Sequence, residues 1–176
     1  MDWKDTISHL YERYAGQGGG TAAAPADPHQ DFQQVAQAAP KDVVAGGLSQ
    51  AMRSDQTPPF PEIVSRLFSH SDPNQRAGLI NRLMDAIGGP QTLASVPGLG
   101  GLAGMLGGGN VTAEQANQID PNQVQQMAAH AETRNPAVVD HVSGFYAQHP
   151  QAVKALGGMA LTIALQHILR RSQRGI

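Results

Sequence analysis

The chain has 176 residues, no cysteine, 15% charged residues and a formal net charge of −2, which allows one domain or two small ones. The lack of cysteine excludes disulfides, thiolate nucleophiles and Cys-ligated zinc, and the slight negative charge gives no overall basic field for nucleic acid. Neither a signal peptide nor an apolar run near the roughly 18 residues of a membrane span is recognisable, so we expect a cytoplasmic protein.

The first predicted element is a short amphipathic helix over residues 1–15. Trp3, Ile7, Leu10 and Tyr14 recur at helical spacing and share one face. Glycine and alanine dominate residues 16–28, which predicts a flexible linker. A helix this short is marginal alone, so we expect its apolar face to dock on its own domain, a second subunit, a partner protein or a membrane surface.

After this linker, proline repeatedly marks the beginning of a helix, because it suits the first helical position and a preceding Asp or Asn caps free N–H groups. The prolines in such positions are Pro40, Pro61, Pro73, Pro121, Pro136 and Pro150. Thr112 and Gln115 have the spacing of a capping box. Alternating β-branched residues are scarce, so the sequence predicts an all-α, multi-helix bundle.

Helical stripes of apolar residues follow several of these prolines. They are Leu79, Ile80, Leu83, Met84 and Ile87, in a helix that Gly88 is expected to end; Val138, Val139, Val142 and Phe145; and Val153, Leu156, Ala160, Ile163 and His167 in a long last helix. We expect core anchors at Phe60, Phe68, Phe145 and Tyr146, with a place at an interface as the alternative.

The pattern of helix starts repeats along the chain. The stretch "QVAQAAPKDVV" at 34–44 is matched by "QANQIDPNQVQ" at 115–125, and Pro73 and Leu79 match Pro150 and Leu156. This favours an internal duplication with a first helical repeat at 29–89 and a second at 111–176, in a homeodomain-like arrangement. Chance similarity between glutamine-rich helices is the alternative.

A Gly-rich connector over 90–110 separates the predicted repeats. Its segment "GLGGLA", from Gly98 to Ala103, satisfies the dinucleotide-binding pattern G-x-G-x-x-G/A. That pattern requires a preceding buried strand, and none is recognisable, so we expect no cofactor here. We expect instead a loosely ordered or partly helical connector that Leu99, Leu102, Met105 and Leu106 hold against the core. Gly100, Gly104 and Gly108 recur at a spacing whose lack of side chains would let two segments cross tightly.

No set of residues has the spacing of a catalytic or metal site. His130, Asp140, His141 and His149 lie close in sequence but lack the i,i+4 histidine pair of a helical zinc site. We expect no enzyme activity, no metal ion, no cofactor and no small-molecule substrate.

Two groups of arginines are candidates for contacting phosphate. Arg170, Arg171 and Arg174 form the candidate nucleic-acid patch near the C-terminus, although cations there also stabilise a helix C-terminus. A second group is Arg66, Arg76 and Arg82.

Several stretches resemble bacterial proteins. "MRSDQTPPF" at 52–60 and "VSGFYAQHPQ" at 142–151 have counterparts in bacterial sequences, and "VTAEQANQIDPNQVQQMAAHAETRNPAVVDHV" at 111–142 resembles the C-terminal half of the YidB family. The resemblance implies a helical fold with a glycine-leucine connector, likened to a homeodomain, and implies no activity.

These features favour a non-enzymatic protein that works by association, either as a homo-oligomer or with a protein partner. Trp3, Ile7, Leu10 and Tyr14 are the expected contact face. The alternatives are a homeodomain-like DNA-binding protein and a peripheral membrane protein.

Overall fold

The computed structural model describes residues 3–15 and 27–174. Within these ranges every regular element is a helix and no strand is present, which confirms the all-α prediction. None of the described helices is long and apolar enough to cross a membrane. The chain divides into two compact units, one formed by residues 1–57 together with 143–176 and one formed by residues 58–142.

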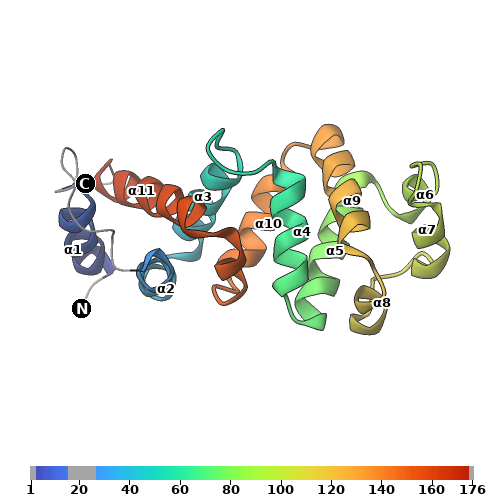
Figure 1. Ribbon diagram of the computed structural model, residues 1–176, viewed down its shortest axis with the longest axis horizontal. Coiled ribbons are helices and arrows are strands. Elements are labelled where there is room, and N and C mark those ends of the chain that lie inside the picture. The colour runs from blue at the N-terminus through green and yellow to red at the C-terminus, as the bar shows by residue number, and fades with distance from the viewer. Residues whose placement is uncertain (1–2, 16–26, 175–176) are drawn as a thin grey trace. The chain divides into compact units, whose positions relative to one another are not determined.

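The first unit is built on the pairing of α3 and α11, which lie side by side (Figure 1). Its elements are α1 (Trp3–Ala15), α2 (Pro28–Ala38), α3 (Lys41–Met52), the 3₁₀ helix η1 (Ala152–Leu156), α11 (Gly158–Arg174) and the second half of α10 (Val138–Ala147). α1 and α2 both pack against α11. The Ser143 hydroxyl donates a hydrogen bond to the Met52 sulfur at 3.5 Å, which joins α10 to the end of α3.

The second unit is built on the pairing of α4 with α9, while α5 packs against α8 and α9 (Figure 1). Its elements are α4 (Phe60–His70), α5 (Pro73–Ile87), α6 (Pro90–Leu93), α7 (Gly100–Leu106), α8 (Ala113–Asn117), α9 (Pro121–Arg134) and the first half of α10. The Ser65 hydroxyl donates to the carbonyl of Pro121 at 3.0 Å, which joins α4 to the start of α9.

Three helices of the second unit begin with complete capping boxes, as Asp, Thr and Gln at these spacings predict. In α5 the Asp72 carboxylate accepts from the Gln75 N–H at 2.9 Å, and the Gln75 side chain accepts from the Asp72 N–H at 3.2 Å. Thr112 with Gln115 and Asp120 with Gln123 form the other two boxes. The predicted stop at Gly88 is also confirmed, because Gly88 caps α5 in the left-handed conformation with φ 104°.

The expected core is confirmed for two apolar stripes and for the aromatic anchors. The stripe before Gly88 and the Val138 stripe are buried, as are Phe60, Phe68, Phe145 and Tyr146. These side chains fill the units because each stripe repeats at helical spacing and covers one face of its helix.

The last helix differs from the prediction in its start and in its buried face. Pro150 is followed only by the 3₁₀ helix η1. Gly157, with φ 82° and ψ 160°, interrupts the helical conformation before α11 begins. Ile163 and His167 are half-buried, whereas the face made of Leu161, Ala164, Leu165, Ile168 and Leu169 is fully buried. The break at Gly157 separates Val153 and Leu156 from the helix whose stripe they were expected to join.

The compact units do not coincide with the predicted repeats 29–89 and 111–176. The first unit combines α2 and α3 with α11, and the second combines α4 and α5 with α8 and α9. Each unit therefore takes helices from both predicted repeats, because the apolar faces that fit one another come from distant parts of the chain. The duplication itself stays a prediction.

The Gly-rich connector 90–110 lies within the second unit rather than between units. Leu99, Leu102 and Leu106 are buried and Met105 is half-buried, which confirms a partly helical connector pinned to the core. Most of its glycines do not serve a tight crossing: a Cβ atom at Gly104 would have no neighbour within 4 Å, whereas one at Gly98 would lie 3.1 Å from Gln126 Oε1.

Candidate functional site

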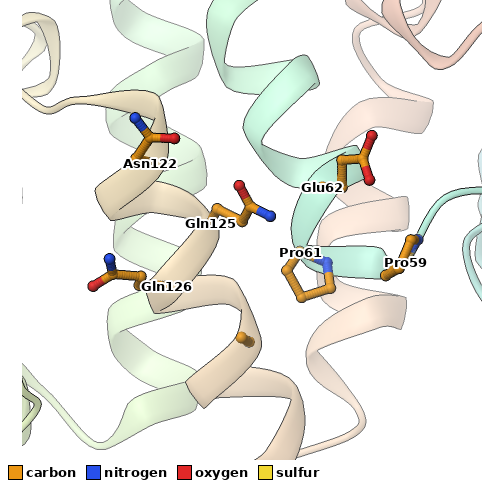
Figure 2. Close-up of a pocket in the computed structure, with 7 residues that line it drawn as sticks. Pro59, Pro61, Glu62, Asn122, Gln125 and Gln126 are labelled. Carbon is orange, nitrogen blue, oxygen red and sulfur yellow. The ribbon is translucent and has the colours of Figure 1, made fainter.

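A surface groove lies in the second unit between the first turn of α4 and the exposed face of α9. It has a volume of about 440 Å³ and is lined by Pro59, Pro61, Glu62, Asn122, Gln125, Gln126 and Ala129. Figure 2 shows Gln125 reaching from α9 toward α4, with Pro61 facing it from α4. The groove therefore has a polar wall of carboxamides and a stiff wall of proline.

Local sequence determines which side chains face this groove. Val124, Met127 and Ala128 are buried between α9 and its neighbours, and helical periodicity turns the intervening Gln125 and Gln126 outward. On α4, Pro59 stands at the N-cap and Pro61 within the first turn, where a proline needs no N–H partner inside the helix. The two walls are brought together by the pairing of α4 with α9.

The carboxamides of the groove have no hydrogen-bond partner among the described residues. They are the side-chain amides of Asn122, Gln125 and Gln126, all exposed. Elsewhere in the second unit the side-chain amides of Gln75, Gln115 and Gln123 are used in capping boxes. The groove thus presents donors and acceptors that the fold itself does not use.

Glu62 places one carboxylate at the α4 side of the groove (Figure 2). One of its oxygens, Oε1, accepts a hydrogen bond from Arg66 Nη2 at 2.6 Å, one turn further along α4. Both side chains are partly exposed, so this ion pair contributes little to stability. The second oxygen of this carboxylate has no partner among the described residues and faces the α4 side of the groove as a free acceptor.

The predicted contact face of the first helix packs partly on its own chain. Ile7 and Leu10 are each only 3% exposed, in a unit where α1 contacts α2 and α11, while Trp3 is half-buried. The side chain of Tyr14, like most of the predicted linker 16–28, lies outside the described residues. Ile7 and Leu10 therefore pack on their own domain, which is one of the alternatives that the sequence left open for this helix.

The predicted nucleic-acid patch lies on the last turns of α11. Arg170, Arg171 and Arg174 are exposed, and none has a hydrogen-bond or ion-pair partner in the described part of the chain. Partial burial and then the positive charges of these arginines, Arg171 first, lower the pKa of His167 on the same helix. This end of α11 is therefore a region of positive potential.

The other candidate arginines all have partners within the second unit. Arg76 donates from Nε to the carbonyl of Phe68 at 3.0 Å and from Nη1 to Asn117 Oδ1 at 3.2 Å, and its guanidinium lies 5.1 Å from the centre of the Phe68 ring. Arg82 donates to the carbonyl of Gly78, and Arg66 pairs with Glu62. These side chains do not converge on a free basic surface.

The histidines singled out from the sequence are not brought together as ligands. Among the described residues no three His, Asp or Glu side chains form a group that could hold a metal ion. His149 instead lies against Phe145, with ring centres 4.7 Å apart.

Sequence reasoning missed the groove. Two signals were present: the prolines around Phe60 and the glutamines of α9 that no helix cap requires. Neither signal predicts that α4 packs beside α9, because that pairing is decided by the tertiary structure.

Comparisons with protein-family models, with curated proteins and with solved structures find no match to this chain. The resemblance to the YidB family accordingly stays a prediction. The function is therefore inferred from the chemistry of the surfaces described above.

Proposed function

We propose that this protein is a non-enzymatic interaction module that binds an extended segment of a partner polypeptide in the groove between α4 and α9. The observation that carries the proposal is the set of unpaired, exposed carboxamides on α9, above all Gln125, which points into the space between the helices (Figure 2). These amides are hydrogen-bonding groups at the groove that no described residue satisfies.

A carboxamide matches the hydrogen-bonding groups of a peptide bond. It offers an acceptor oxygen and two N–H donors, while an extended chain presents one N–H and one C=O per residue without internal partners. The protein contains this pairing internally: Val111 N–H donates to Asn81 Oδ1 at 2.8 Å, and Asn81 Nδ2 donates to the Val111 carbonyl at 3.5 Å. A bound segment would be held at Gln125 by the same kind of pairing.

The other lining residues suit a peptide as well. Pro59, Pro61 and Ala129 give small apolar contact surfaces, and the two prolines present no N–H that would compete for the ligand's carbonyls. The Glu62 carboxylate favours a segment with a basic side chain near one end. A volume of about 440 Å³ accommodates a few residues.

The test is selection of binders from a random heptapeptide library displayed on phage, followed by affinity measurement on synthetic peptides. We expect enriched peptides to bind Gln125→Ala about tenfold more weakly, since one hydrogen bond to a peptide group is lost and its partner is left unsatisfied. The matched control is Gln37→Ala, an exposed glutamine on α2 in the other unit.

Two results would contradict the proposal: no peptide is enriched, or the enriched peptides bind Gln125→Ala and Gln37→Ala equally well. Light scattering on the protein alone separates a partner segment from a segment of a second copy. A mass that increases with concentration in the parent and not in Gln125→Ala would identify the occupant as another copy of this chain.

A further inference from the structure

The last turns of α11 carry a compact set of cations, Arg170, Arg171 and Arg174, here called the arginine face. These residues span roughly 6 Å of helix axis, and all three are exposed. Their guanidinium groups lie within one or two turns of one another, so their fields add.

The arginine face is not neutralised within the described chain. No hydrogen bond or ion pair to a described residue satisfies any of the three guanidinium groups. In contrast, Arg66, Arg76 and Arg82 all have protein partners. Burial and then the positive charges of the three arginines lower the pKa of His167 on the same helix.

The glycines of α3 bring Arg171 close to that helix. A Cβ atom at Gly46 would lie 3.0 Å from Arg171 Nη1, so the absence of a side chain at Gly46 leaves room for the guanidinium beside α3. Arg170 and Arg174 are exposed on the same turns of α11, so the three cations are spread along the surface of the helix.

We propose that the arginine face binds the phosphate backbone of nucleic acid. Arginine donates paired hydrogen bonds to phosphate oxygens, and cations spread along a helix suit a ligand that presents several phosphates in a row. A duplex carries one negative charge per roughly 1.7 Å of its axis, so it offers a phosphate to each arginine.

A membrane surface fits this face less well. An interfacial helix needs a broad apolar side that inserts among the lipids. Among the described residues the one large apolar side chain that is strongly exposed is Met159, at the opposite end of α11. The arginine face therefore offers positive charge without an apolar surface that could insert among lipids.

The test is fluorescence anisotropy of a labelled 20-base-pair duplex titrated with the full-length protein at several salt concentrations. Three phosphate contacts predict a slope of log K against log salt of about −2.7, or a loss of about 40-fold in affinity between 50 and 200 mM salt. Arg174→Gln should reduce the slope by about one, and Arg170→Gln/Arg171→Gln/Arg174→Gln should abolish binding. Lys154→Gln, an exposed cation outside α11, is the charge-matched control.

The proposal is overturned by an absence of duplex binding at 50 mM salt, or by binding that the triple variant retains. It is also overturned if the protein sediments with vesicles containing anionic lipid, in an arginine-dependent manner, but does not bind the duplex. Circular dichroism confirms that the variants fold, since glutamine is nearly as good a helix former as arginine. The single variant Arg174→Gln, at an exposed position, keeps the test informative if the triple variant does not fold.

Discussion

Gly47 of α3 lies so close to Ile168 of α11 that a Cβ atom on Gly47 would be 2.6 Å from Ile168 Cγ1. The same atom would lie 2.8 Å from the carbonyl oxygen of Ala164, which belongs to the backbone of α11 and cannot rotate away. The pairing of α3 and α11, on which the first unit is built, therefore requires glycine at this position.

Gly47→Ala should destabilise the protein by about 1–3 kcal/mol, because the added methyl group separates two packed helices. This loss outweighs the gain of up to about 1 kcal/mol that alanine brings in helix propensity. Urea denaturation followed by circular dichroism measures the change in the free energy of unfolding.

Gly104→Ala is the matched control, because Gly104 lies within α7 and an added Cβ would meet no atom within 4 Å. We expect this variant to be as stable as the parent or more stable, by up to about 1 kcal/mol. Equal effects at Gly47 and Gly104 would show that α3 and α11 do not cross as closely as described.

Asp120→Ala should lower the free energy of unfolding by about 1 kcal/mol, because it removes the capping box at the start of α9. Asp85→Ala removes the same charge from an exposed position inside α5 and should change stability by less than about 0.5 kcal/mol. Thermal unfolding of the two variants side by side distinguishes loss of a cap from loss of a charge. A similar shift in both would refute the capping role.

Ile7→Ala should cost about 2 kcal/mol of stability, because Ile7 is buried in the unit where α1 packs on α2 and α11. The exposed neighbour Asp5 supplies the control Asp5→Ala, with little expected change. If Ile7→Ala left the free energy of unfolding unchanged but altered the mass measured by light scattering, α1 would instead dock on a second subunit.

His167 should make stability depend on pH. Burial and the nearby arginines lower its pKa in the folded protein, whereas the unfolded chain has the ordinary value near 6.5. Between these two values the unfolded state binds more protons, so this contribution is fully present above pH 6.5 and is lost as pH falls through the folded pKa. When the pH is lowered from 7.5 to 5, the free energy of unfolding should therefore fall less in His167→Gln than in the parent. Thermal unfolding of both proteins at each pH measures the difference.

Predictions from local sequence were the most accurate. The helix starts expected at Asp72 and Asp120, the capping box expected at Thr112 and the stop expected at Gly88 all formed, because each depends on residues within one turn of the chain. The long last helix was placed wrongly, because Gly157 adopts an extended, positive-φ conformation that the apolar periodicity around it does not reveal.

The glycines illustrate where sequence reasoning failed. The conspicuous run from Gly98 to Gly109 suggested a place for close approach, yet most of its glycines face open space. The close crossing occurs at Gly47, in a segment with no unusual composition. A close contact depends on which two helices pack together, and the local sequence of one helix does not identify its partner.

By itself the sequence predicted that the chain is all-helical, where several of its helices begin, where α5 ends, and which faces of most helices are apolar. These features depend on capping, backbone restriction and side-chain periodicity within a few residues. The tertiary structure alone decided that α3 pairs with α11 and α4 with α9, and therefore that the groove and the arginine face exist as surfaces. Any apolar stripe can pack on several others, and only the fit of whole helices selects among partners distant in the chain.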